Sequence, residues 1–255
     1  MAPTASIRSR SDLGNSLAIR VGCDDGWATC QPGQFYLLRA GTSWTPYLRR
    51  ALFPFFIDPN ELGFLIRPGH DIAAGWLAAQ PVGSALDLIG PLGKGFVADD
   101  QQRRILLAAE NSSLAVLLPL IPPALARQAS VVVLHHAHRS ADLLPASVLP
   151  PAVEYYTSCD EPSPGQPSTM EDELERALSW ADGLFLAGPA SFLARTKTSV
   201  AAVRFAVNRG FAQAVAPAPL RCGVGACLAC LVDTGRGRHR ACVRGPVFDL
   251  GDLAL

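Results

Sequence analysis

The chain has 255 residues, which is enough for one large domain or two to three small ones and excludes a minimal peptide scaffold. Its 22 basic and 22 acidic residues cancel, and only 17% of residues are charged, so no overall field attracts nucleic acid or an anionic membrane. The 49% hydrophobic content excludes a disordered chain, and seven unevenly placed cysteines do not form a disulfide scaffold.

The N-terminal stretch, residues 1–17, contains basic residues but lacks the continuous apolar stretch of a signal peptide. The longest apolar stretch, residues 114–126, is shorter than a membrane span and is interrupted by three prolines. We therefore expect a cytoplasmic protein without a membrane partner. In that reducing compartment Cys23, Cys30 and Cys159 are expected to be free thiols.

The first part of the chain is predicted to be a small β-barrel or sandwich. Short extended segments separated by glycine and proline support this prediction, with a helical turn expected at residues 75–80. A polar stretch at residues 99–102 suits a linker. The extended segments are residues 17–22, 31–41, 55–57, 62–68 and 85–96.

After residue 103 the pattern changes to strands alternating with helices, which predicts a mostly parallel sheet. The expected strands are residues 104–109, 131–136, 154–158 and 183–188, and the expected helices are residues 112–128, 170–181 and 191–210, the last ending at Gly210. The segment from Ser158 to Thr169 is rich in Pro, Ser and Gly, and we expect it to lie outside the sheet.

Two polar clusters in this region have simple structural interpretations. The acids of residues 170–173 fit the first turn of a helix better than a catalytic carboxylate pair. His135, His136 and His138 resemble a metal-binding tract only in composition, and they are expected to form local hydrogen bonds at a strand end.

The strongest chemical signal is the spacing of Cys222, Cys227, Cys230 and Cys242, C-x4-C-x2-C-x11-C. The first three match the plant-type spacing for a [2Fe–2S] cluster, which needs four thiolates and a closely wrapped loop. Glycines and a small alanine at residues 223–226 would let backbone N–H groups approach the sulfurs. A hairpin over residues 231–242 is expected to return the fourth cysteine to the other three.

Two alternatives to an iron–sulfur cluster remain open. A four-cysteine zinc site usually has two separated C-x2–4-C pairs, whereas here three cysteines fall within nine residues and the fourth stands alone. The other alternative is a chance cluster that binds no metal. His239 is expected to be a solvated hairpin residue rather than a ligand.

The cysteine loop and the GPVF at residues 245–248 resemble the electron-transfer subunit of class 1B dihydroorotate dehydrogenase, in the ferredoxin-reductase superfamily. Other motifs of this family have counterparts along nearly the whole chain. They are PGQF at residues 32–35, LRR at residues 48–50, GPLGKGF at residues 90–96 and Gly188-Pro189 in place of the family's CGP.

This resemblance implies a multi-domain β plus α/β fold. The expected domains are an FAD-binding-type β-barrel at residues 1–99, an NAD-binding-type parallel α/β domain at residues 100–214 and a [2Fe–2S] module at residues 215–255. The implied function is that of an electron-transfer subunit rather than a stand-alone enzyme, passing electrons between FAD and the cluster. The implied partner is a catalytic flavoprotein subunit resembling dihydroorotate dehydrogenase, and the implied process is pyrimidine biosynthesis.

The flavin contacts of the family are only partly present. By resemblance, FAD would be contacted at Arg49, Arg50, Gly75 and Gly93, and the two arginines could pair with its pyrophosphate. However, Phe53 stands where the family has a polar residue. Ala73 and Ala74 replace a Gly-Thr that contacts the flavin phosphates. We therefore expect weak FAD binding.

The nucleotide-binding turn departs further from the family. A glycine-rich turn normally brings backbone amides against a pyrophosphate, but residues 109–116 contain no glycine, and Glu110 adds negative charge. Asn111 and Ser112 are expected to cap the following helix, and Arg103 or Arg104 could supply a neutralising cation. We expect poor or no NAD(H) binding. These losses leave a second hypothesis, a non-catalytic binding or regulatory subunit on a degenerate reductase scaffold with a structural metal cluster.

Overall fold

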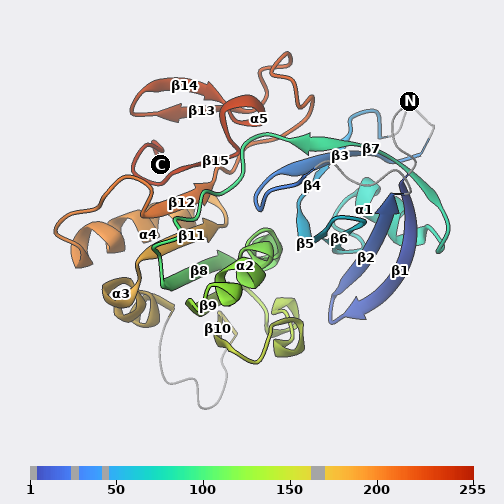
Figure 1. Ribbon diagram of the computed structural model, residues 1–255. Helices are drawn as coiled ribbons and strands as arrows, with labels where there is room; N and C mark the ends of the chain where they lie inside the picture. The colour runs from blue at the N-terminus through green and yellow to red at the C-terminus, as the bar shows by residue number, and fades with distance from the viewer. Residues whose placement is uncertain (1–4, 24–28, 42–45, 162–169) are drawn as a thin grey trace.

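The computed structural model describes residues 5–23, 29–41, 46–161 and 170–255. Figure 1 shows two large sheets side by side, with a small two-stranded sheet near the C-terminus. The described parts of the chain contain no helix long and apolar enough to cross a membrane.

The N-terminal sheet has seven antiparallel strands in the order β4-β3-β7-β1-β2-β6-β5. Its two edge strands, β4 and β5, are separated in sequence by Phe53 alone, so the sheet curls back on itself in the manner of a barrel. Side chains such as Ile19, Tyr36 and Phe64 fill its interior. The strands are β1 (Ala5–Leu13), β2 (Ser16–Cys23), β3 (Phe35–Arg39), β4 (Arg50–Leu52), β5 (Pro54–Asp58), β6 (Glu61–Ile66) and β7 (Ala85–Leu92), and helix α1 is Ile72–Ala79.

The second sheet has six strands in the order β10-β9-β8-β11-β12-β15, parallel except for the edge strand β15. Its strands are β8 (Arg104–Glu110), β9 (Ser130–Ala137), β10 (Val153–Cys159), β11 (Gly183–Ala187), β12 (Ala212–Val215) and β15 (Val247–Asp249). The helices are α2 (Ile121–Ala126), α3 (Met170–Trp180) and α4 (Ala190–Val203), and the short 3-10 turns are η1 (Asn111–Val116), η2 (Leu118–Leu120), η3 (Ser140–Asp142) and η4 (Ala146–Val148).

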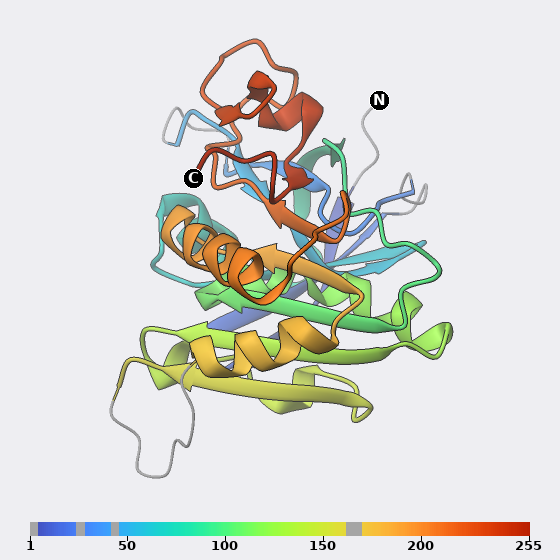
Figure 2. The same cartoon turned by 90° about the vertical axis from the view of Figure 1, so that its left-hand side faces the viewer.

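The alternation of side chains along β8 explains how this sheet is covered. Leu106 and Ala108 pack with α3 and α4 on one face, whereas Ile105 and Leu107 pack with η1, η2 and α2 on the other. Figure 2 shows α3 and α4 together on one side of the sheet. The opposite face contacts the barrel, because Phe53 belongs to its hydrophobic cluster. The predicted β plus α/β fold class is confirmed.

The C-terminal segment forms a hairpin, β13 (Leu231–Thr234) and β14 (Gly237–Arg240), followed by the short helix α5 (Ala241–Arg244). It then contributes β15 to the six-stranded sheet, where Val247 pairs with Val215. The boundaries of the three predicted domains stay a prediction, because this segment shares a sheet with the preceding one.

Three predictions of secondary structure were wrong in detail. The helix expected to end at Gly210 ends at Val203, because Arg204 turns to an extended conformation and its side chain binds Leu178 and Ala181. Ser158 and Cys159 were expected outside the sheet but complete β10. The sequence analysis missed β1, β4, β12 and β15. Residues 162–169 of the polar loop lie outside the described part of the chain.

Candidate functional site

The hairpin of the C-terminal segment brings Cys242 back to Cys230. Cys222 and Cys227 lie in the loop after β12, Cys230 directly precedes β13, and Cys242 lies in α5. The Ala241 N–H donates to the Cys230 carbonyl at 2.9 Å, and this bond holds the two ends of the hairpin together. The structure thus confirms the predicted hairpin and its return of Cys242 to Cys230, whereas ligation by all four cysteines stays a prediction.

The thiols lie in two pairs. The Sγ atoms of Cys230 and Cys242 are 3.3 Å apart, and the Cys242 N–H points at the Cys230 sulfur at 3.5 Å. The side chains of Cys222 and Cys227 also form a hydrogen bond. Within the described chain, no three of the four sulfurs lie within 4.8 Å of one another. A tetrahedral zinc site would place all four about 3.8 Å apart, given Zn–S distances of about 2.3 Å.

Backbone N–H groups donate hydrogen bonds to the cysteine sulfurs. N–H groups of Cys227, Val224 and Ala226 donate to the Cys222 sulfur and lower the pKa of that thiol to about 6. Burial raises the pKa of Cys242, although the Gly225 N–H donates to its sulfur. The loop therefore presents amides to sulfur, as an anionic iron–sulfur core requires.

Glycine is needed in this loop for steric reasons. Gly223 and Gly225 have φ angles of 71° and 76°. A Cβ on Gly223 would lie 2.6 Å from a methyl carbon of Leu92, and one on Gly225 would lie 2.9 Å from a methyl carbon of Val243. Side chains at these positions would push the loop away from the hydrophobic surface beneath it.

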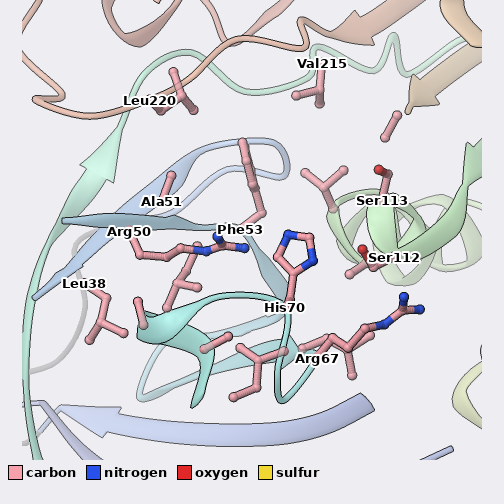
Figure 3. A pocket seen from close by; sticks show the side chains of 18 of the residues that line it. Leu38, Arg50, Ala51, Phe53, Arg67, His70, Ser112, Ser113, Val215 and Leu220 are labelled. Carbon is pink, nitrogen blue, oxygen red and sulfur yellow. The ribbon is translucent and has the colours of Figure 1, made fainter. Parts of the chain in front are cut away.

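A cavity of about 390 Å³ lies between the two large sheets. Figure 3 shows Arg50, Arg67 and His70 on its barrel side and Ser112 and Ser113 on its α/β side. Its volume falls in the usual range for small-molecule and cofactor sites. Arg67 and His70 were not predicted, because nothing in the local pattern shows that residues after β6 face the second sheet.

The cations in this cavity are partly neutralised. Arg50 forms an ion pair with Asp71, whose carboxylate also accepts a 2.8 Å hydrogen bond from the Ala74 N–H and caps α1. Burial lowers the pKa of Arg50, and the charge of Arg221 lowers it further. Arg67 pairs with Asp142 at 2.8 Å, while the Nε of Arg67 is buried without a hydrogen-bond partner among the residues that the structure describes. An anionic ligand could satisfy this donor.

The cavity and the cysteines share one hydrophobic cluster. Phe53 and Leu220 line the cavity and belong to the same cluster as Cys222, Cys230 and Cys242. Ala51 and Ala218 also line the cavity and belong to this cluster. Apolar side chains therefore connect the cavity wall to the cysteines.

The predicted FAD contacts differ in their placement. Arg50 lines the cavity, but Arg49 lies outside its lining and binds Asp87 with two hydrogen bonds of 2.9 and 2.8 Å. Gly75 lies in α1, where an added Cβ would have open space. A Cβ on Gly93 would lie 2.7 Å from the carbonyl oxygen of Gly245, so Gly93 allows the barrel to pack on the C-terminal segment. Flavin contacts at these glycines stay predictions.

The turn after β8 corrects two expectations. Asn111 and Ser112 do not cap a helix: Asn111 has φ 56°, and its side-chain oxygen instead accepts a 3.2 Å hydrogen bond from the His138 N–H. Arg104 lies at the opposite end of β8 and pairs with Asp182 at 2.6 Å, so it does not face the turn. Buried Glu110 instead pairs with Arg195, at 3.4 Å.

The histidines form the expected local bonds. His135 is buried between the Tyr155 hydroxyl at 2.8 Å and the Asn111 carbonyl at 2.9 Å. Burial lowers the pKa of His135 to about 4, so it is neutral near pH 7. His239 lies on β14 and stacks on the ring of Phe248.

The remaining cysteines and acids outside the cavity also agree with the simple interpretations. Cys30 and Cys159 are free thiols, and the side chain of Cys23 lies outside the described part of the chain. Glu171, Asp172 and Glu173 occupy the first turn of α3, as predicted.

Comparisons with known proteins find related proteins for the C-terminal segment and for most of the chain. Residues 219–254 match the family described as the iron-sulfur cluster binding domain of dihydroorotate dehydrogenase B. The electron transfer subunit of dihydroorotate dehydrogenase B (NAD(+)) from Shouchella clausii is 28% identical over 235 residues, 88% of this chain and 87% of that protein. The corresponding subunit from Desulforamulus reducens is 26% identical, with 85% and 84% covered.

Solved structures agree on the fold. An NADH-dependent reduced ferredoxin-NADP oxidoreductase structure superposes with a TM-score of 0.81 at 17% identity, covering 100% of this chain and 90% of that one. The cytochrome b5 reductase domain of Ulva prolifera nitrate reductase gives a TM-score of 0.62 at 17% identity, with 79% and 92% covered. The resemblance predicted from the motifs is confirmed over most of the chain, and the fold is of the ferredoxin-reductase type.

Proposed function

We propose that this chain is the iron–sulfur electron-transfer subunit of a larger oxidoreductase, with a [2Fe–2S] cluster and FAD as its cofactors. The observation that carries the proposal is that Phe53 and Leu220 line the cavity and also belong to the hydrophobic cluster that contains three of the four cysteines. A flavin can exchange two electrons with a substrate and single electrons with a cluster, which by itself carries only one.

The four cysteines support a two-iron cluster better than a mononuclear metal. Two thiols in each of two pairs match the two irons of a [2Fe–2S] core, each of which needs two protein ligands. The amides around Cys222 would stabilise the negative charge of the cluster and help set its potential. We propose Cys222, Cys227, Cys230 and Cys242 as the four ligands.

The cavity supports a flavin with weakened phosphate contacts. Arg50 and Arg67 give it a cationic wall beside His70, and the Nε of Arg67, which has no partner among the described residues, can donate to a phosphate oxygen. Phe53 offers apolar contact in place of a hydrogen bond, and Asp71 competes for Arg50. These residues would bind FAD, but with a lower affinity than a site with all its phosphate contacts.

We propose that the partner is a catalytic flavoprotein subunit resembling dihydroorotate dehydrogenase, by analogy with the relatives of this chain. Exposed apolar side chains surround the cysteine loop, namely Val224, Leu228 and Val243. Such a patch beside a cluster suits a protein interface across which electrons move over a short distance.

We expect NADH to bind poorly to this subunit. The turn after β8 has side chains where a pyrophosphate site needs uncovered amides, and the Asn111 carbonyl is turned to His135. Buried Glu110 would repel the phosphates of NADH. The single positive charge of Arg195 offsets only one of the negative charges that Glu110 and the phosphates bring together. Anaerobic stopped-flow mixing with micromolar NADH should therefore leave both flavin and cluster oxidised. Rapid reduction of the flavin or the cluster would show instead that this chain oxidises NADH directly.

The second candidate is a non-catalytic subunit in which the cluster is structural. The Arg50–Asp71 ion pair favours this structural role, because Asp71 neutralises the arginine that a flavin pyrophosphate would bind. Flavin content separates the two candidates: protein that contains iron and sulfide but takes up no FAD on reconstitution supports the structural role.

The proposed function is tested by reduction through the partner. Anaerobic protein reconstituted with iron, sulfide and FAD is mixed with the dihydroorotate dehydrogenase catalytic subunit of the same organism and with dihydroorotate, then frozen for EPR. We expect the signal of the reduced cluster to appear only when both the catalytic subunit and dihydroorotate are present. A fully loaded protein that stays oxidised under these conditions contradicts the proposed partner.

A further inference from the structure

Three potential metal ligands converge at the carboxyl ends of β9 and β10. His136 Nε2 lies 3.2 Å from one carboxylate oxygen of Asp160, and His138 Nδ1 lies 2.7 Å from the other. One ligand atom from each of these three residues lies within 4.8 Å of the other two. The group belongs to neither the cavity nor the cysteine loop. Figure 1 shows β10 and the β13–β14 hairpin at opposite ends of the molecule.

The second ring nitrogen of each histidine faces an oxygen atom. His136 Nδ1 is 2.9 Å from the Ser158 hydroxyl, and His138 Nε2 is 3.6 Å from the Glu110 carboxylate. His136 is oriented as histidines that bind metals commonly are, with one nitrogen free for the metal and the other hydrogen-bonded to an oxygen atom. Ser158 lies on β10 and buried Glu110 ends β8, so the sheet fixes both the hydroxyl that orients His136 and the carboxylate near His138.

Charge and access also favour a cation. Asp160 and Glu110 bring two carboxylates to the two imidazoles, while Arg195, 3.4 Å from Glu110, offsets only one of them. The nearby Arg139 is paired with Asp142, and Glu161 accepts hydrogen bonds from Ser140. The His138 and Asp160 side chains are 62% and 60% exposed, so an ion can enter from solvent without a change in fold.

We propose that His136, His138 and Asp160 form a divalent transition-metal site whose best-fitting ion is Zn²⁺. Two imidazole nitrogens and one carboxylate oxygen are a zinc ligand set that leaves a fourth position for water. Mg²⁺ and Ca²⁺ prefer oxygen ligands throughout, so they fit this site less well. The site is independent of the proposed electron-transfer function.

Zinc titration of the full-length, cluster-loaded protein tests this proposal by calorimetry under anaerobic conditions. Wild type should bind one equivalent of Zn²⁺, and both His138→Ala and Asp160→Asn should weaken binding at least tenfold. Because both side chains are exposed, these variants should fold as the wild type does. The matched control His70→Ala, at an exposed histidine outside the group, should leave zinc affinity unchanged.

X-ray absorption at the zinc edge identifies the ligands directly. We expect nitrogen or oxygen neighbours at about 2.0–2.1 Å and no sulfur at about 2.3 Å. Replacing the orienting hydroxyl with Ser158→Ala should cost roughly tenfold in affinity. Absence of zinc binding, equal affinity in the His138 and Asp160 variants, or sulfur neighbours from the cysteine loop would each overturn the proposal.

Discussion

Asp71 is the residue that most changes how the cavity receives an anion. Its carboxylate accepts a hydrogen bond from the Ala74 N–H at the start of α1 and forms an ion pair with Arg50. One side chain of the protein therefore binds both the helix N-terminus and the arginine. Both groups would otherwise be free to bind the phosphates of FAD.

Replacing Asp71 with Asn should therefore strengthen FAD binding. Asparagine keeps the cap but removes the charge that competes for Arg50. We expect the Kd for FAD to fall about fivefold to tenfold, measured by flavin fluorescence quenching. Asp87→Asn is the matched control, because Asp87 pairs with Arg49 outside the cavity lining and should leave the Kd unchanged. Weaker binding by Asp71→Asn would show that the carboxylate supports the site.

For single residues, the sequence predicts which side chains carry the chemistry better than it predicts where those side chains lie in the fold. The cysteine spacing alone identified the four candidate ligands, because their chemistry depends on a loop and a hairpin that are local in sequence. Arg67 and His70 were missed, since their role depends on a second sheet formed by residues far along the chain. The sequence also placed Arg49 and Arg50 together, although their side chains separate in the structure.

Among the elements, α4 shows why helix ends are hard to predict. The apolar and basic pattern continues to Gly210, yet the helix stops at Val203. The Arg204 guanidinium donates to the carbonyls of Leu178 and Ala181 at 2.7 and 2.9 Å and lies 4.1 Å from the centre of the Phe211 ring. One side chain thus joins the end of α3 to the end of α4 and to the start of β12.

Arg204→Ala should lower the free energy of unfolding by about 2 kcal/mol, because two carbonyl hydrogen bonds and a cation–π contact are lost together. Urea unfolding followed by circular dichroism measures this change. Arg209→Ala removes an exposed pair with Asp252 and should cost at most about 1 kcal/mol. If the two variants lose the same stability, Arg204 does not tie these elements together.

Strand and helix patterns in the α/β region were predicted well because the buried strands there are short apolar runs and α3 is clearly amphipathic. The strands that were not predicted form for a different reason. β1 carries mostly polar side chains and is half exposed, and β15 has only three residues, so their pairing comes from neighbouring strands.

On the scale of the whole molecule, Asp142 links the two large sheets. Its carboxylate accepts a hydrogen bond from Asn15 at 3.2 Å and pairs with Arg67 at 2.8 Å, both from the barrel, and with Arg139 of the α/β part. Burial alone would raise the pKa of Asp142. The hydrogen bonds from Arg139 and Asn15 and the charges of Arg67 and Arg139 outweigh burial and hold the pKa below its usual range.

Asp142→Asn should lower the free energy of unfolding by about 1–3 kcal/mol at pH 7. Because the folded pKa is below the unfolded value of about 3.9, the carboxylate stabilises the fold above that pH and loses its effect as pH falls further. The difference between variant and wild type should therefore be full at pH 7 and shrink below pH about 4. Asp100→Asn, at an exposed position, should show no difference at either pH. A pH-independent loss would contradict the charge argument.

The change from the antiparallel sheet to the parallel sheet could be predicted from the change in pattern near residue 100, but the contact between the two sheets could not. The cavity depends on residues from β4, the segment after β6, η1 and the loop after β12. Nothing local in sequence brings these four segments together. Electron transfer between the two proposed cofactors depends on this arrangement, because the cavity lining and the cysteines share one hydrophobic cluster.

Metal and sulfide analysis combined with EPR of anaerobically purified, dithionite-reduced protein tests this account most directly. We predict two irons and two sulfides per chain and a spin-1/2 signal at low temperature, which serine at any of Cys222, Cys227, Cys230 or Cys242 removes or alters while Cys159→Ser leaves it unchanged. Stoichiometric zinc at these cysteines without iron, or a signal that survives all four substitutions, would contradict it.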